Sequence, residues 1–340
     1  MTGLRFAAIG LDHRHIYGMS EGMLDAGCEL AGYWTEGEPQ PLAGFMKRFP
    51  AAERFDTRQR LLDDRTVPLF LIAAPPAERA MLAIEAMRHG KDVMVDKPGC
   101  LTLDELAAIR TVVAATGRIW SVNFSERFEV RAVTRATELV RAGRIGEIVQ
   151  TMSTGPHRLN LHMRPDWFFD PALYGGILGD IGTHQIDQFL FFAGAATAEI
   201  VHAAVGNFAN PGLPKFEDWG ELNLKAGKTQ GYVRVDWYTA EALPNWGDGR
   251  LFLYGTEGQI ELRKYVDLKG RPGIDHLFLV NGKDYEYVDC ATAELPYFRQ
   301  LADDVRDRGE TACPQAHTFA VTELAIRAQQ RAERRGHLAG

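Results

Sequence analysis

The sequence predicts an α/β protein in two parts, a doubly wound parallel sheet at the N-terminus and an α+β domain after it. Through residue 124, short apolar runs alternate with amphipathic helical patterns, as in a parallel sheet with helices on both faces. Beyond it, strand-like runs follow one another through short turns, which favours a mostly antiparallel sheet. The 340 residues also exceed one typical single-core domain. We therefore expect domains at 1–124 and 125–340.

Composition and charge exclude several classes of protein. The chain is 46% hydrophobic and 24% charged, with a net charge of −7 and no run of Lys or Arg. This argues against a nucleic-acid or anionic-membrane partner. No apolar run approaches the roughly 18 residues of a membrane span, and the N-terminus lacks the apolar segment of a signal peptide. The scattered Cys28, Cys100, Cys290 and Cys313 form no CxxC, so we expect free thiols and a cytoplasmic protein.

The first 124 residues give the alternation element by element. Strands are expected at Leu4–Ile9, Glu29–Trp34, Pro68–Ala73, Asp92–Val95 and Ile119–Phe124. Helices are expected at Ile16–Ala26, Leu42–Phe49, Glu78–His89 and Leu103–Ala115, with a helix end at Leu61–Asp64. The nearly unbroken hydrophobicity of Pro68–Ala73 suits a strand covered on both faces. Thr102 and Glu105 predict a capping box at the start of the last helix.

The turn after the first strand has the position of a dinucleotide-binding turn but not its usual glycines. GxGxxG would place glycine at 10, 12 and 15, whereas the chain has Gly10, Asp12 and His15 in GLDHRH. Asp12 would oppose a pyrophosphate unless it turns away, and it could instead cap the following helix. His13, Arg14 and His15 could supply compensating donors. We therefore expect a modified cofactor turn, with a metal site of Asp12, His13 and His15 as the alternative.

The second strand runs into Thr35 and Glu36. An acidic residue at this strand end commonly binds the adenosine ribose, so Glu36 is a cofactor candidate with Thr35 beside it. No Arg or Lys follows directly, which favours NAD over NADP. A solvated loop acid is the alternative interpretation of Glu36.

A glycine-rich entry precedes the central motif, Tyr174–Phe192. Asp180, His184 and Asp187 lie at i, i+4 and i+7, so they share one face of the predicted helix. An acid at a helix start with a His one turn later can make a tuned general base. An ordinary core helix with a hydrogen-bonded His is the alternative. On the opposite face we expect burial of Ile186, Phe189, Leu190 and Ala193.

The remaining elements are mostly strands. Helices are expected at Val130–Arg141, Pro296–Arg308 and Thr318–Arg334. Strands are expected at Ile148–Thr154, Ala198–Gly206, Glu221–Lys225, Gly231–Trp237, Arg250–Tyr254, Gln259–Leu262, His276–Val280 and Tyr285–Val288. Hairpin turns are expected at 226–228, 256–258 and 281–282, the last being a strong Asn-Gly signal.

Three features together resemble the glucose–fructose oxidoreductase / inositol dehydrogenase family, written Gfo/Idh/MocA. They are the N-terminal unit, Asp96-Lys97-Pro98 after the fifth strand position, and Gly175-Gly176 followed by Asp180-Ile181-Gly182-Thr183-His184-Gln185-Ile186-Asp187. The resemblance implies an N-terminal Rossmann domain, a C-terminal domain with a large open sheet, and a cleft between them. It also implies a nicotinamide cofactor, a sugar or polyol substrate, and a homodimer or homotetramer formed through the open sheet.

The resemblance assigns roles residue by residue. Lys97 matches the family's catalytic lysine, Asp180 its substrate-holding acid and His184 its acid/base histidine, while Arg127-Phe128 resembles a common pair. Asp96 stands where the family has Glu, a mild departure. The expected cofactor residues are Gly10, Leu11, Asp12, His13, His15, Thr35, Glu36, Ala74, Pro75, Asp96, Lys97 and Asn123.

The expected chemistry is hydride transfer between a hydroxy compound and NAD, with NADP as the second candidate. His184 would take the hydroxyl proton and Lys97 would donate to the reacting oxygen. His157, Arg164 and Trp167 would join Asp180 and His184 in binding a sugar, although each could be an ordinary loop residue. An NAD-assisted lyase or glycosidase and a non-catalytic sensor are the competing functions.

Overall fold

The computed structural model describes residues 3–338, which form two compact units. Of the described residues, 3–123 and 296–322 form the first unit, and 124–295 and 323–338 form the second. The structure thus differs from the expected domains in one respect, because the segment 296–322 belongs to the N-terminal unit.

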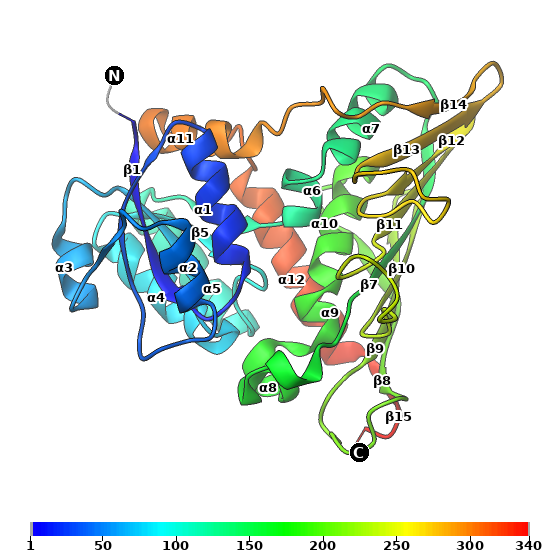
Figure 1. Cartoon of the computed structure of the whole chain (residues 1–340). Coiled ribbons are helices and arrows are strands. Elements are labelled where there is room, and N and C mark those ends of the chain that lie inside the picture. Colours follow the sequence, from blue (N-terminus) through cyan, green and yellow to red (C-terminus); the bar gives the residue numbers. More distant parts are fainter. Residues whose placement is uncertain (1–2, 339–340) are drawn as a thin grey trace. The chain divides into compact units, whose positions relative to one another are not determined.

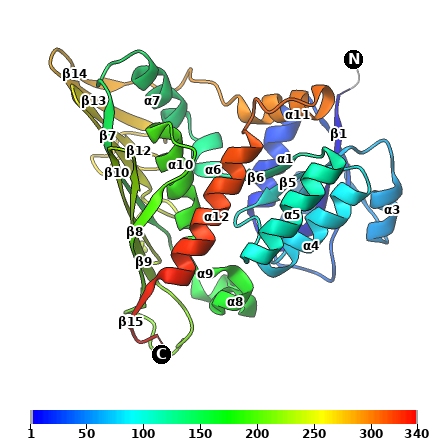
Figure 2. The ribbon, with the colours of Figure 1, turned by 180° about the vertical axis from the view of Figure 1, so that it is seen from behind.

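The N-terminal unit is a parallel sheet of six strands in the order β3-β2-β1-β4-β5-β6. Figure 1 shows α1 and α2 in front of this sheet, and Figure 2 shows α4 and α5 on its other face. This is the predicted doubly wound arrangement. The strands are β1 (Arg5–Leu11), β2 (Glu29–Trp34), β3 (Glu53–Arg54), β4 (Leu69–Ala73), β5 (Asp92–Asp96) and β6 (Trp120–Asn123). The helices are α1 (His15–Asp25), α2 (Leu42–Arg48), α3 (Arg58–Asp63), α4 (Pro76–Arg88), α5 (Leu103–Thr116), α11 (Tyr297–Asp307) and the start of α12 (Gln315–Arg331).

The two-residue strand β3 was not predicted, whereas the capping box of Thr102 and Glu105 on α5 is confirmed. Asp12 does not cap α1, contrary to one expectation. The N-cap of α1 is Arg14, whose side chain makes no capping hydrogen bond.

Apolar contacts hold the two C-terminal helices to the first unit. Phe298 of α11 occupies the space beside Gly22 of α1, where a Cβ would be 2.4 Å from its ring. Phe319 of α12 stacks on Trp120, with ring centroids 5.4 Å apart. Because these partners lie in the first 123 residues, the helices bury their apolar faces there.

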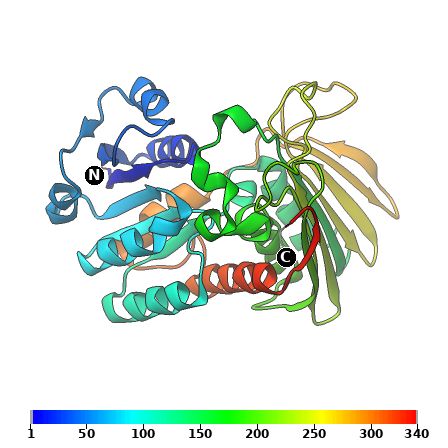
Figure 3. The ribbon, with the colours of Figure 1, turned by 90° about the horizontal axis from the view of Figure 1, so that it is seen from below.

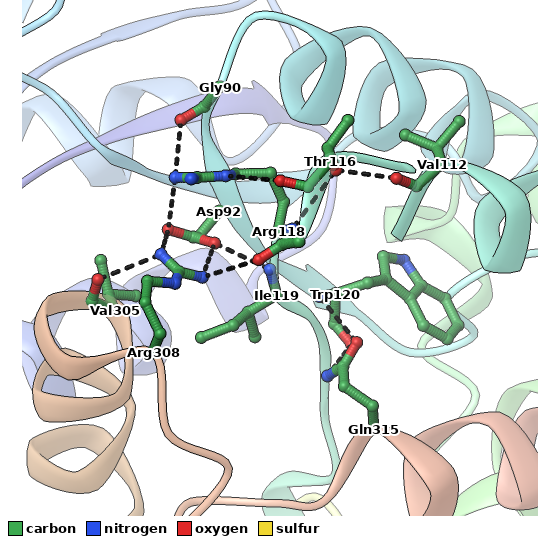
Figure 4. Close-up of polar contacts among 11 residues, drawn as sticks. Gly90, Asp92, Val112, Thr116, Arg118, Ile119, Trp120, Val305, Arg308 and Gln315 are labelled. Carbon is green, nitrogen blue, oxygen red and sulfur yellow. Dashed lines mark hydrogen bonds and ion pairs between the residues drawn. The ribbon is translucent and has the colours of Figure 1, made fainter. Parts of the chain in front are cut away.

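A charged contact also anchors the end of α11 (Figure 4). Arg308 donates to both oxygens of the buried Asp92, at 2.8 and 2.7 Å, and Ile119 N–H donates to Asp92 Oδ1 at 2.7 Å. Arg118 lies 3.7 Å from the same carboxylate. Asp92 begins β5, so this clamp stands at the amino ends of the strands, away from the edge where ligands bind in such sheets.

The second unit is built on a nine-stranded mixed sheet in the order β14-β13-β12-β11-β7-β10-β9-β8-β15. β7–β10 and β8–β15 are parallel and the other pairs are antiparallel, so the mostly antiparallel prediction is confirmed. The strands are β7 (Ile148–Pro156), β8 (Glu199–Asn207), β9 (Trp219–Ala226), β10 (Thr229–Asp236), β11 (Arg250–Gly255), β12 (Gly258–Arg263), β13 (His276–Asn281), β14 (Tyr285–Val288) and β15 (Glu333–Gly336). All three predicted hairpin turns join neighbouring strands.

Helices of the second unit lie on one face of this sheet. They are α6 (Ser125–Phe128), α7 (Arg131–Arg141), α8 (Pro171–Tyr174), α9 (Gly176–Asp180) and α10 (Gly182–Ala193), with short 3-10 turns at Leu161–Met163 and Asp166–Phe169. Figures 1 and 3 show α7, α9 and α10 along that face, while no described helix of this unit covers the other. The large, open sheet implied by the family resemblance is therefore present.

Two sequence expectations fail in this unit. The closing helix ends at Arg331, and residues 333–336, expected to be partly helical, form β15 against β8. The central motif forms two helices that meet at Ile181, because α9 already begins at Gly176. Burial also extends over both faces of α10 from Gly182 to Leu190, beyond the predicted apolar face.

None of the described helices has the length and apolar character needed to cross a membrane. All four cysteines are free and buried, as expected from their spacing.

Candidate functional site

The carboxyl ends of β1, β4 and β5 carry the predicted cofactor residues of the first unit. Gly10 has a φ of +70°, and a Cβ there would lie 2.5 Å from that of Ala74. Only glycine allows the strand to approach this closely. The N–H groups of Asp12 and His13 both donate to the Ala73 carbonyl at 3.0 Å. The turn is therefore tightly held even without the second and third glycines of the usual fingerprint.

A buried carboxylate, Asp96, organises the polar side chains at this edge. His13 Nδ1 lies 2.9 Å from Asp96 Oδ2, and His15 Nδ1 lies 2.8 Å from Oδ1. Arg79 of α4 donates to Oδ2 at 3.0 Å and to the carbonyl of Ala74 at 2.8 Å. Burial acts to raise the pKa of Asp96, but His15, Arg79 and His13 together hold it well below its usual range. A permanently ionised Asp96 thus orients both imidazoles.

Three acids gather beside this cluster. Burial, followed by the charge of Glu78, raises the pKa of Asp12 from 3.8 to about 6, although Arg79 opposes the shift. Glu36 acts in the same direction on Asp12, and burial followed by the charge of Glu36 raises the pKa of Glu78. The negative charge at the end of β2 therefore extends beyond the predicted Glu36.

The other predicted cofactor residues lie at the same strand ends. Leu11 N–H donates to Thr35 Oγ1 at 3.2 Å, which ties β1 to the end of β2. Asp96 pairs with Asn123 in the ladder between β5 and β6, and both are fully buried. Lys97 is 4% exposed, and its N–H donates to Asp96 Oδ1 at 2.8 Å. Ala74 and Pro75 form the connection from β4 to α4.

The structure changes the composition of the alternative metal site. Among the described residues, His13, His15 and Asp96 have ligand atoms within 4.8 Å of one another, and Asp12 is not in this group. Asp96 is already bonded to the Arg79 guanidinium, and each imidazole directs its Nδ1 at that carboxylate. This geometry fits a hydrogen-bonded carboxylate with two histidine donors.

The second unit holds Asp180 and His184 at the junction of α9 and α10. Asp180 is 7% exposed and His184 2% exposed. Glu217 accepts from Ile177 N–H at 2.8 Å, and Gln329 accepts from Leu178 N–H at 3.0 Å, which satisfies the start of α9. Gly176 has a φ of +74° and has the Gln329 side chain where a Cβ would stand. The glycine entry thus fixes the helix start rather than leaving it flexible.

Asp187, the third polar residue of the motif, has a structural partner. Arg127 donates to both of its oxygens at 2.7 Å, from Nε and from Nη2. The guanidinium also lies over the rings of Phe128 and Phe191, at 4.5 and 4.6 Å. The Arg127-Phe128 pair therefore locks α6 to α10, on which His184 stands.

Two of the predicted substrate residues meet on Trp237. The His157 ring is 5.3 Å from that of Trp237, and the Arg164 guanidinium is 4.9 Å above it. Trp167 is further out and contacts Phe168, with ring centroids 6.2 Å apart. A pocket of about 470 Å³ adjoins this cluster and is lined in part by Arg158, Asn160, His162, Trp237 and Tyr238.

Sequence reasoning missed Arg79, Glu126 and Lys264. Arg79 lies on the same face of α4 as Leu82, Ala83 and Ala86, so the helical period of the sequence predicts that Arg79 is buried. Glu126 and Lys264 form an ion pair of 2.5 Å and are 1% and 0% exposed. Their separation in sequence left no pattern from which the pair could be predicted.

Comparison with known proteins places the chain in a family. Residues 6–124 match the model of the oxidoreductase family with an NAD-binding Rossmann fold, and residues 133–261 match the Gfo/Idh/MocA C-terminal domain. The chain therefore belongs to the Gfo/Idh/MocA family of oxidoreductases. Its first unit is the NAD-binding Rossmann domain of that family, as the resemblance implied.

Individual relatives agree with this assignment. A crystal structure of a presumed oxidoreductase from Erwinia carotovora atroseptica superposes with a TM-score of 0.94 at 43% identity, over 98% of this chain and 100% of that one. A scyllo-inositol 2-dehydrogenase (NADP+) from Bacillus subtilis is 24% identical over 76% of this chain and 75% of its own. Levoglucosan dehydrogenase from Pseudarthrobacter phenanthrenivorans is 29% identical over 48% and 43%. The chain spans about half the length of the first curated relatives that it matches.

Proposed function

We propose that the protein is an NAD-dependent dehydrogenase that oxidises a secondary hydroxyl of a sugar, polyol or related compound. The observation that carries the proposal is the buried pair Asp180 and His184, one helical turn apart at the α9–α10 junction. Dehydrogenases of inositol and levoglucosan among the relatives support this substrate class.

The proposed roles follow from side-chain chemistry. His184 accepts the hydroxyl proton as the alcohol is oxidised, and Asp180 orients it or binds a second hydroxyl. Lys97 donates to the reacting oxygen and stabilises the charge that develops on it. His157, Arg164 and Trp237 offer polar groups and an aromatic surface of the kind that binds sugars.

The strand ends of the first unit fit a dinucleotide. Gly10 leaves the backbone free of a Cβ, and the side chains of His13 and His15, held by Asp96, replace the missing glycine contacts. These strand ends would hold a nicotinamide dinucleotide, which would supply the hydride acceptor for the reaction. Asp12, Glu36 and Glu78 would repel the additional 2′-phosphate of NADP, so we infer a preference for NAD.

The test is a panel of sugars and polyols assayed with NAD and with NADP, followed by the absorbance of the reduced cofactor. We expect turnover of at least one member with NAD and weaker turnover with NADP. Consumption of a substrate without net NADH would instead indicate a lyase or glycosidase. Ligand binding without any turnover would indicate a sensor. Either result would refute the dehydrogenase.

A further inference from the structure

Glu126 is a buried carboxylate of the second unit that has no role in the proposed mechanism. It belongs to α6, and its Oε2 accepts from Lys264 Nζ at 2.5 Å and from Gln185 Nε2 at 2.9 Å. All three residues are at most 1% exposed. A buried ion pair is a poor source of stability, because apolar side chains in its place often hold a fold equally well.

The contacts of Glu126 lead to both candidate histidines. Gln185 follows His184 on α10, so the bond from Gln185 fixes the turn on which His184 stands. The Gln185 amide also lies against Gly155 of β7, where an added Cβ would be 2.9 Å from Nε2. His157 is two residues further along, and its Nδ1 is 3.0 Å from the Gly155 carbonyl.

We propose that Glu126, held by Lys264, is a positioning residue for His184: it fixes Gln185 and supplies a fixed negative charge beside the imidazoles of His184 and His157. The part that concerns catalysis rests on the proposed function, in which His184 is the base. The claim that Glu126 fixes Gln185 rests only on the contacts within the second unit.

The charge of Glu126 is only partly compensated. Its second oxygen, Oε1, is buried and accepts no hydrogen bond from any of residues 3–338. Burial acts to raise the pKa of Glu126, but Lys264, His184 and His157 lower it to about 2. Because such interactions are mutual, the ionised carboxylate favours the protonated form of both imidazoles.

Other charged groups lie around His184. On its own helix pair it has Asp180 and Asp187, the second of which is neutralised by Arg127. From the neighbouring segments come Glu126, its partner Lys264 and His157. Neither Glu126 nor Lys264 is a proposed substrate contact. Each can therefore be substituted separately, and the effects of the two substitutions can be compared.

The experiment compares Glu126→Gln with Lys264→Met in the full-length protein. Glu126→Gln removes the negative charge, so the acid limb of the kcat/KM profile should move to lower pH by about one pH unit. Lys264→Met leaves the carboxylate uncompensated, so the limb should move to higher pH. A merely structural role predicts lower activity in both variants without movement of the limb in opposite directions.

A second measurement does not depend on the substrate. NMR titration of labelled histidine rings, with His184 assigned through His184→Asn, should show the same opposite shifts. Shifts without turnover in any assay would leave the positioning role intact and refute the proposed function. The positioning role alone would be overturned by a different pair of results. Turnover would require His184, but the pKa of His184 would shift in neither variant or would shift in the same direction in both.

Controls separate charge from damage to the fold. Leu279→Ala, in the apolar core of the same unit, should lower stability without moving the acid limb. Should Glu126→Gln fail to fold, Glu126→Asp and the double variant Glu126→Gln/Lys264→Met provide the comparison. Glu126→Asp retains the charge and should retain the profile, and the double variant should titrate close to the wild type because the two opposite shifts largely cancel. A His184 titration in the double variant that is shifted as far as in Lys264→Met alone would then refute the proposal.

Discussion

Asp12 carries a charge that the fold disfavours. Its pKa is raised from 3.8 to about 6, mainly by burial and next by Glu78, so the folded protein holds this proton more tightly than the unfolded chain does. The resulting destabilisation is absent below pH 3.8, grows as the pH rises toward 6, and is complete above 6. We predict that Asp12→Asn stabilises the protein at pH 8 by on the order of 2 kcal/mol and has little effect at pH 4.

Thermal or urea unfolding of both proteins across this range measures the effect. Glu38→Gln is a suitable control, since Glu38 is an exposed acid of the neighbouring loop. The quantity to compare is the gain in stability of Asp12→Asn over wild type at each pH. If that gain is no larger at pH 8 than at pH 4, the environment described for Asp12 is wrong.

Lys97 and His184 can be tested by removing their function while retaining their volume. We predict that Lys97→Met and His184→Asn each lower kcat by about 10² to 10⁴-fold, because each loses a group that acts in the transition state. Circular dichroism and NAD binding would establish that the variants are folded. Near-wild-type turnover in either variant would remove that residue from the mechanism.

At this scale the sequence could predict residues whose chemistry follows a short pattern. The spacing of Asp180 and His184 predicted that they lie close together, and both are buried on either side of the junction at Ile181. Arg79 and Glu126 were missed because their function depends on partners far away in the chain, Asp96 and Lys264 respectively. The capping role expected for Asp12 was wrong, since the turn bonds the Ala73 carbonyl and α1 begins only at His15.

The C-terminal end of α11 is tied to the N-terminal sheet by one side chain. Arg308 bonds both oxygens of the buried Asp92 although its own side chain is 37% exposed (Figure 4). We predict that Arg308→Met destabilises the protein by about 1–2 kcal/mol, less than for a fully buried pair, because Arg118 and Ile119 N–H still contact the carboxylate. Urea unfolding measures this difference.

Arg306 provides the matched control on the same helix. It pairs with Asp303 at 2.9 Å but is 42% exposed, and its partner is 53% exposed. Arg306→Met should change stability by no more than about 0.5 kcal/mol. Equal effects of the two substitutions would mean that the bond to Asp92 does not anchor α11.

Elements with a clear period were predicted within a few residues, and those that depend on packing were not. The strands β8 to β14 follow from alternating burial and hairpin turns. In contrast, β15 has the exposed sequence Glu333-Arg334-Arg335-Gly336, which carries no strand pattern and pairs only because β8 offers an edge. The start of α9 at Gly176 depends on Glu217 and Gln329, which satisfy its first N–H groups and are distant in sequence.

For the whole chain, the two sheets could be predicted because their connections differ. Strands alternate with helices in the first sheet, whereas strands follow one another through short turns in the second. The assignment of residues 296–322 to the first unit could not, since it depends on the contacts of Phe298 with Gly22 and of Phe319 with Trp120. From their order in the chain alone, those helices would be assigned to the second domain.

The helix-free face of the nine-stranded sheet leads to the last prediction. Leu251, Leu253 and Leu279 alternate into the core, so the intervening Phe252 and Tyr254 face the other way, with rings stacked 6.3 Å apart. Partly exposed aromatic residues on a sheet face without helices favour contact with another protein surface. We predict a homodimer or homotetramer formed through this face, and Phe252→Lys should shift it toward the monomer because an unpaired charge would be buried there.

Sedimentation velocity would measure the change, with Met81→Lys, on the exposed side of α4, as the control. A monomeric wild type, or equal behaviour of the two variants, would show that this face is not the contact between copies.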